Sequence, residues 1–167
     1  MILYFFTIHI VFFTLSFGYL DIIKTKKYKE VCMLITKASE YAILSLILLS
    51  TKDTPQDSET LSGELFISKS FLAKILQALA KNDILKSYKG ANGGFVLNKA
   101  PSEIDILSIV SSVEGKAPSV FECSSNANDC PSDKANICSI WPMLNRLQKN
   151  IDNFLASLTL GDILEEK

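Results

Sequence analysis

Histidine is almost missing from this chain of 167 residues: the single one, His9, lies in an apolar leader, and none follows Met33. Also missing after Met33 are a nucleophile with a paired base and a glycine loop of recognised phosphate-binding form. Acid–base and nucleophilic catalysis depend on such groups. The sequence therefore predicts a protein that is not an enzyme.

Closely spaced cysteine pairs are missing too. Cys123, Cys130 and Cys138 follow the spacing C-x6-C-x7-C in a polar loop, whereas zinc knuckles place two cysteines about two to four residues apart. Thiolates are preferred ligands of zinc, copper(I) and iron–sulfur clusters, and the wide intervals favour a cluster. The alternative is an exposed loop with incidental thiols, or a disulfide that leaves one of them over. The fourth cysteine, Cys32, falls at the end of the leader.

The net charge of −1 hides an uneven distribution. Residues 69–99 carry six lysines against one acid, Asp83, whereas ten acids outnumber five bases from Ala100 onward. This separation predicts one surface that faces a polyanion; a solvated charge run is the alternative. At 48% hydrophobic and 21% charged residues, the chain allows one domain with a real core, plus appendages.

The first 23 residues are nearly all apolar and precede a lysine-rich stretch at 24–29. Their length would permit a membrane span that leaves the rest of the chain in the cytoplasm. A cleaved signal peptide is disfavoured, because a basic n-region and a small-residue cleavage site are absent. The globular pattern begins abruptly at Met33, so we favour translation from Met33, with 1–32 an upstream extension and the protein cytoplasmic. If 1–23 are expressed, a membrane-tethered iron–sulfur protein is the alternative.

Hydrophobic periodicity predicts three helices in the first half of the globular region. Residues 35–50 read as a core helix and 60–66 as a short amphipathic helix. In the segment 71–87, an apolar stripe at helical spacing from Phe71 to Leu79 indicates the third helix. Ser68 or Ser70 is the expected N-cap of the third helix. A short helix, a tight turn and a second helix form a helix-turn-helix, which presents its second helix to the major groove of DNA.

A basic β-hairpin is predicted directly after these helices. Residues 84–89 and 95–97 alternate around a Gly/Asn turn, and the lysines on them suit phosphate contact. A helix-turn-helix followed by such a hairpin is a winged helix, so we assign 33–99 to a DNA-binding domain. A structural helix pair beside a solvated hairpin is the alternative.

The second half of the chain is predicted to be helical around the cysteine loop. A connecting segment, 100–122, contains a helix that starts at Asp105 and stops at Gly115, and the cysteine loop occupies 123–138. Within the closing segment, 139–167, apolar residues spaced by threes and fours predict a long helix that pairs with its copy in a second chain, followed by a tail. Packing within the monomer is the alternative. The predicted fold class is mainly α with a small β-hairpin: a winged helix-turn-helix domain plus a long dimerisation helix.

From Met33 to about Leu164 the sequence resembles the IscR/NsrR-like (Rrf-two-type) winged-helix transcriptional regulators, many of which carry an iron–sulfur cluster. Several motifs in order carry the resemblance: MLITKASEYA, ISKSFLAKILQALAKNDILKS, YKGANGGFVL, the VEG before the loop, the three cysteines and LTLGDIL. The leader before Met33 has no counterpart in that family.

The resemblance implies a homodimer on a near-palindromic double-stranded DNA operator, with one recognition helix in each half-site and the wing on the flanking backbone or minor groove. By position, the residues implied to approach DNA are Ser68, Lys69, Ser70, Phe71, Lys74, Lys89, Gly90 and Asn92. Ala73 is a departure, because some relatives have an acidic residue there that restricts the operators they accept. The operator preference of those relatives therefore does not carry over.

The resemblance also implies an iron–sulfur cluster, 2Fe-2S or 4Fe-4S, on the three cysteines, through which the regulator senses redox state, oxygen, nitric oxide or iron–sulfur status. Some members add a histidine three residues after the last cysteine; that position is Trp141 here, whose indole offers no lone pair to a metal. Other members use a carboxylate of the partner subunit, and that position is Glu40, which an ordinary exposed helix acid would equally explain. A thiol-redox or zinc-structured regulator on the same scaffold is the alternative.

Overall fold

In a computed structural model of the protein, the structure describes residues 34–90 and 93–166. The leader with His9 and Cys32, and with it the choice between starts at Met1 and Met33, lies outside these residues. Among the helices that the structure describes, none combines the length and apolar character that a bilayer crossing requires.

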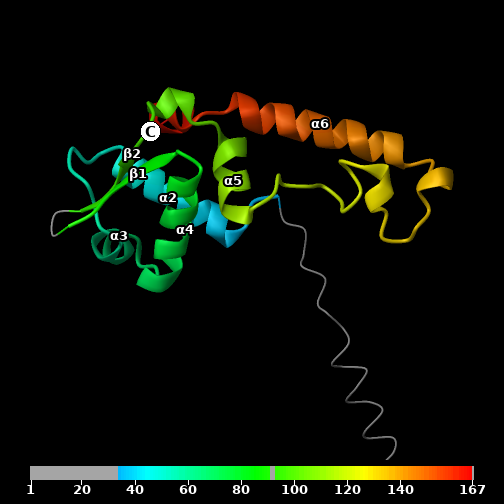
Figure 1. The fold of residues 1–167 in the computed structure, drawn as a ribbon. Helices are drawn as coiled ribbons and strands as arrows, with labels where there is room; N and C mark the ends of the chain where they lie inside the picture. The colour runs from blue at the N-terminus through cyan, green and yellow to red at the C-terminus, as the bar shows by residue number, and fades with distance from the viewer. Residues whose placement is uncertain (1–33, 91–92, 167) are drawn as a thin grey trace, which may run out of the picture. The chain divides into compact units, whose positions relative to one another are not determined.

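Three helices form the helical part of the winged helix (Figure 1). They are α2 (Lys37–Leu49), α3 (Ser58–Leu65) and α4 (Lys69–Lys81). Each helix is capped by the residue before it, which is Thr36, Asp57 and Ser68 respectively. The side chain of that residue accepts backbone N–H groups of the first turn. These caps bond N–H groups that have no partner inside the helix, which fixes where each helix begins. Of the two predicted caps of α4, the structure selects Ser68.

The core lies where these three helices meet. Its fully buried members include Leu46 of α2, Leu61 of α3, and Leu72 and Leu76 of α4. The predicted apolar stripe of α4 is buried except at its first member, Phe71, which is 39% exposed. Burial of this stripe fixes α4 against α2 and α3, so the N-terminal turn of α4 is held in one orientation.

Two antiparallel strands, β1 (Leu85–Tyr88) and β2 (Gly94–Leu97), form the predicted hairpin, the wing. The segment before α3 joins it: the Gln56 N–H donates to the Phe95 carbonyl at 3.1 Å, and the Phe95 N–H donates back at 2.8 Å. A side chain at position 94 would not fit this contact, because a Cβ there would lie 2.5 Å from the Gln56 carbonyl. The helix-turn-helix and wing confirm the predicted fold class, mainly α with a small β-hairpin.

A connecting helix, α5 (Ile106–Glu114), follows a 3-10 turn, η1 (Pro101–Glu103). The Asp105 side chain caps α5, and Gly115 ends it with a left-handed φ of 72°, both as predicted. The chain ends in a further helix, α7 (Leu160–Glu165), where the sequence predicted only a tail. The missed signal is a capping box in which Thr159 and Asp162 bond each other's backbone N–H groups.

The long helix α6 (Trp141–Ser157) follows a loop that contains two 3-10 turns, η2 (Ala127–Asp129) and η3 (Ala135–Ile137). The predicted apolar seam of α6 divides between two environments. Leu155 is buried, and Ile151 and Leu158 pack on the same core, whereas four members are exposed: Ile140, Met143, Leu147 and Phe154. Packing within the chain therefore accounts for only part of this seam.

Candidate nucleic-acid interface and thiol site

The N-terminal turn of α4 carries the residues implied to approach DNA. The Ser68 hydroxyl accepts the Phe71 N–H at 3.4 Å as the cap, and Ser70 is exposed at the start of the helix. Lys69 is ion-paired with Glu59 of α3, and that hydrogen bond raises the pKa of the Lys69 ammonium. A phosphate would have to compete with Glu59 for this lysine, so its charge is only partly available.

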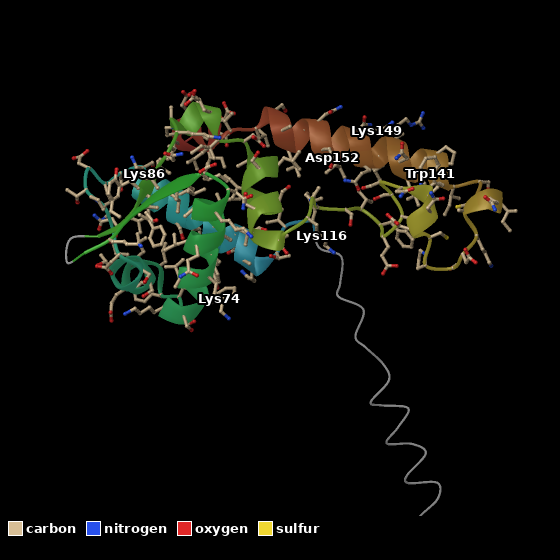
Figure 2. The ribbon with its side chains drawn as sticks, viewed as in Figure 1. Lys74, Lys86, Lys116, Trp141, Lys149 and Asp152 are labelled. Carbon is tan, nitrogen blue, oxygen red and sulfur yellow. The ribbon has the colours of Figure 1, made fainter. Side chains whose placement is uncertain are left out.

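Two further α4 residues, Phe71 and Lys74, differ in how freely their side chains could contact DNA. The ring of Phe71 packs edge-on against Tyr41 of α2, with centroids 6.0 Å apart, and is therefore partly used in packing. Lys74 is exposed one turn further along α4 (Figure 2). Of the two α4 lysines implied to approach DNA, Lys74 is the better placed to give its whole charge to a polyanion.

The wing supplies a second group of cations. Lys86 and Lys89 are exposed on β1 and just after it, and the Lys86 ammonium lies 5.4 Å from the centre of the Tyr88 ring. Gly90 takes a φ of 108° at the turn, a conformation that L side chains rarely adopt. Asn92, the last of the predicted DNA residues, lies outside the described residues.

The turn between α3 and α4 holds a residue that the sequence did not single out. Phe66 ends α3 in the left-handed region, with φ 55° and ψ 40°, and its side chain is 97% exposed. Glycine is the usual residue in this backbone conformation, because a Cβ there is strained. The position combines backbone strain with a fully exposed aromatic ring.

Cys123, Cys130 and Cys138 carry free thiols. Cys123 is buried, with 4% of its surface exposed, and the other two are half-buried. Within the described residues, no three His, Cys, Asp or Glu side chains lie close enough together to hold one metal ion. The donor chemistry fits a soft metal or a cluster, but one described chain does not present a finished site.

The surroundings of two of these thiols shift their pKa in opposite directions. Burial, and after it the neighbouring Cys130, raises the pKa of the Cys123 thiol. The pKa of Cys130 is lowered, first by the Lys134 N–H, whose nitrogen lies 3.4 Å from Sγ, and then by the Ser132 N–H. Backbone donors stabilise a thiolate, so Cys130 ionises more readily than Cys123.

The segment that contains Cys123 is bound to one face of α6. The Trp141 indole N–H donates to the Cys123 carbonyl at 2.8 Å, and the Asn145 amide donates to the Ser124 carbonyl at 2.9 Å. Figure 2 shows Trp141 at the end of α6 that adjoins the loop. At the position where some relatives carry a ligating histidine, this chain thus has a side chain that bonds the backbone of a cysteine.

Gln148, 2% exposed, completes this face of α6 with four hydrogen bonds. Its side-chain oxygen accepts from the Val120 N–H at 2.9 Å and the Ser124 hydroxyl at 2.6 Å. Its amide nitrogen donates to the Pro118 carbonyl at 2.8 Å and to Asp152 at 2.7 Å. Gln148 was not predicted as a site residue, although it is a polar residue on the stripe formed by Leu144, Ile151 and Leu155, a pattern that signals a buried polar contact.

Glu40, the implied fourth ligand, is half-buried in the first turn of α2 and pairs with Lys37 at 2.6 Å. It is not grouped with the cysteines in the described chain. Nearby, the Ser39 hydroxyl donates to the Glu114 carboxylate at 2.8 Å, and the Thr36 hydroxyl donates to it as well. The start of α2 is therefore bonded to the end of α5, and residues 115–122 connect this point to the cysteine loop.

A helix-turn-helix followed by a basic hairpin defines the class of winged-helix DNA-binding proteins. The family pattern described as "Rrf2: Iron-dependent Transcriptional regulator" matches residues 35–166. The chain belongs to this family of transcriptional regulators, which confirms the resemblance seen in the sequence and the prediction that the protein is not an enzyme.

Three relatives support this assignment. YffB of Lactococcus lactis is 30% identical over 77% of this chain and 83% of its own length. NsrR of Geobacillus kaustophilus is 29% identical over 81% of this chain and 92% of its own, and IscR of Klebsiella pneumoniae 25% identical over 81% and 82%. NsrR and IscR are both named as HTH-type transcriptional regulators.

Solved structures share the fold at lower identity. IscR of T. potens superposes with a TM-score of 0.61 at 19% identity, covering 80% of this chain and 88% of that one. CymR of B. subtilis, described as the global cysteine regulator, gives 0.60 at 23% identity, covering 81% and 98%. The oxidized form of Staphylococcus aureus CymR gives 0.58 at 21% identity, covering 80% and 97%.

Proposed function

We propose that the protein is a homodimeric regulator whose binding to a double-stranded DNA operator is modulated by an iron–sulfur cluster on Cys123, Cys130 and Cys138. The supporting observation is that two faces of α6 differ: one face binds the segment that contains Cys123, and another exposes apolar side chains. A regulator of this kind acts in the cytoplasm, and we include that location in the proposal.

The exposed apolar residues of α6 favour a second copy of the chain as their partner. Ile140, Met143 and Leu147 repeat at spacings of three and four, and Phe154 continues the series two turns later. Such a series on a 17-residue helix suits pairing with an identical helix. Both α6 helices would then carry a cysteine loop beside the interface.

A cluster fits the chemistry of this loop. Three thiols that are not joined in disulfides offer soft ligands, and the loop lacks a regular ladder that would fix its backbone. When bound, a cluster would supply a group that oxygen, nitric oxide or a change of redox state alters. The fourth ligand in this proposal is Glu40 of the second copy, at the position where other members of the family use a carboxylate of the partner subunit.

Regulation then follows from linkage. A ligand that binds one arrangement of the two subunits better than another shifts the population toward that arrangement. The loop is hydrogen-bonded to α6, and Glu114 before the loop is bonded to the start of α2. The spacing of the two α4 helices on DNA is the property that such a shift would change.

The test is anaerobic purification of the full chain, with visible absorption and analysis of iron, sulfide and zinc. We expect a coloured protein with iron and sulfide in similar amounts. Glu40→Ala should alter the spectrum or speed its loss in air, whereas the matched control Glu64→Ala, another helix acid paired with a lysine, should not. A colourless, iron-free protein after strictly anaerobic work would rule out the cluster.

The dimer is tested on the same preparation by sedimentation. Met143→Lys places a charge in the exposed apolar series and should shift the chain toward monomer, whereas Lys149→Ala, on the same helix, should not. A monomeric wild-type chain at the concentrations that bind DNA would contradict the homodimer.

A thiol-based regulator on the same scaffold is the second candidate. It is favoured by the three free thiols, two of them half-buried, and by the fold shared with CymR, a structure of which is of an oxidized form. Protein without iron whose DNA affinity changes reversibly with a thiol oxidant would select this candidate. Stoichiometric zinc would instead select a zinc-structured regulator.

A further inference from the structure

We propose that Trp141, Asn145 and Gln148 are positioning residues that hold the segment 118–124 on α6 and shield the Cys123 thiol. Reagents from solution would then reach Cys130 and Cys138 first. The proposal deepens the proposed function, since it concerns the same thiol site, but it does not require a bound cluster. We call these three side chains the α6 clamp.

The spacing of the clamp follows from helix geometry. Trp141, Asn145 and Gln148 are four and three residues apart, so they lie on one face of α6. Along that face they bond the segment at successive points: the Cys123 carbonyl, the Ser124 carbonyl and the Pro118 carbonyl. A segment without secondary structure of its own thereby acquires a fixed position on a helix.

Gln148 carries most of this arrangement. A buried amide has one oxygen that accepts and one NH2 group that donates, and here each group makes two bonds. Removing Gln148 would leave the Val120 N–H and the buried Pro118 carbonyl without these hydrogen-bond partners. A buried polar group without a hydrogen-bond partner costs free energy in the closed state, so segment 118–124 would detach from α6 more often.

The shielding follows from the same contacts. Cys123 is 4% exposed, although it lies in a loop whose other cysteines are half-buried. Its backbone carbonyl is held by the indole of Trp141, which lies at the start of α6. The three thiols therefore differ in access, and the difference depends on α6.

The test uses the reduced, metal-free full chain without DNA, and N-ethylmaleimide as the thiol reagent. Labelling of each cysteine is followed by mass spectrometry over time. In the wild type, Cys130 and Cys138 should label at least about tenfold faster than Cys123. Gln148→Leu should raise the Cys123 rate by about tenfold and change the Cys130 and Cys138 rates less than twofold.

Matched variants separate positioning from general loosening. Gln77→Leu, on the exposed side of α4, should leave all three rates unchanged. Gln148→Glu keeps the acceptor for Val120 and Ser124 but loses both donor bonds and sets its carboxylate against Asp152, so its Cys123 rate should also rise above that of wild type. If Gln148→Leu does not fold, Asn145→Ala removes a single bond and should raise the Cys123 rate less, by a few-fold.

Two results would overturn the proposal. One is a wild-type Cys123 that labels as fast as Cys130; the other is a folded Gln148→Leu variant whose Cys123 rate is unchanged. Equal acceleration at all three cysteines would also contradict it, because that pattern indicates general loosening. Because neither metal nor DNA is present, failure of the cluster hypothesis leaves these outcomes intact, and failure of the clamp leaves the cluster hypothesis intact.

Discussion

Phe66 shows how a single residue can carry both strain and exposure. Its left-handed backbone is stable for glycine, whereas a Cβ at this φ of 55° is costly, and its ring is almost wholly in solvent. We expect Phe66→Gly to raise the free energy of unfolding by up to about 1 kcal/mol, measured in urea. Phe66→Ala is the control: it removes the ring but keeps the Cβ, so it should not give this gain. A less stable glycine variant would contradict the strain.

Asp57 gives a prediction about pH. Backbone N–H groups, first that of Thr60 and then that of Glu59, lower the pKa of this capping carboxyl. A lowered folded-state pKa means that the carboxylate stabilises the fold above the unfolded pKa and loses this effect as the pH falls through the lowered value. Asp57→Ala should therefore melt at a lower temperature than wild type at neutral pH, and the difference should shrink in acid.

Asp57→Asn is the matched control for this prediction. Asparagine keeps an acceptor for the first-turn N–H groups but does not titrate, so its melting temperature should lack the acid-dependent component. Thermal melts followed by circular dichroism between neutral and strongly acidic pH check both variants. A difference between wild type and Asp57→Ala that persists unchanged in acid would show that the carboxylate charge is not involved.

The wing, as an element, depends on a glycine that lets two backbones approach. A Cβ on Gly94 would lie 2.5 Å from the Gln56 carbonyl, so Gly94→Ala must push β2 away from the segment before α3. We expect a loss of about 1–3 kcal/mol in the free energy of unfolding and weaker DNA binding, because the wing is displaced. Urea unfolding and binding to a DNA duplex are the two measurements.

At Gly63 the same substitution to alanine should change the free energy of unfolding in the opposite direction. It lies inside α3, and a Cβ there would meet nothing within 4 Å. Gly63→Ala should therefore stabilise the protein by about 0.5–1 kcal/mol and leave the wing in place. If both substitutions changed the free energy of unfolding equally, the close contact between Gly94 and Gln56 would not determine the position of the wing.

Local sequence signals predicted where helices begin and end, but they predicted less well which helix faces are buried. The cap at Asp105 and the stop at Gly115 were predictable, because both depend on neighbouring backbone groups only. The division of the α6 seam was not predictable, since Leu155 is buried in the core while Phe154 beside it is exposed. Sequence spacing gives the faces of a helix but not what covers each face.

The same limit applies to the site. The three cysteines and the basic α4 were identifiable from residue type and order. The use of Trp141 as a donor to Cys123, and the burial of Gln148 under the loop, required the path of residues 118–124, which no periodicity specifies. Whether Glu40 of a second copy reaches the thiols depends on a subunit arrangement that one chain does not encode locally.

At the scale of the whole molecule, charge separation has a measurable consequence. The basic residues from Lys69 to Lys99 lie on α4 and the wing or close after them, whereas the acids predominate from Ala100 onward. Binding to DNA releases counterions in proportion to the phosphates that cations neutralise. The salt dependence of affinity therefore counts the cations that touch DNA, and a homodimer contributes each of them twice.

Substitutions of Lys74 and Lys149 test which lysines contribute to this salt dependence. Both are exposed helix lysines, Lys74 on α4 and Lys149 on α6, as labelled in Figure 2. On a 30-base-pair duplex, Lys74→Ala should weaken binding and reduce the slope of log affinity against log salt by about 1 for each copy that touches phosphate, hence about 2 for a dimer. Lys149→Ala should leave the slope unchanged. A reduction near 1 would indicate that one α4 helix of the assembly engages DNA, and equal slopes for all three proteins would place the interface away from α4.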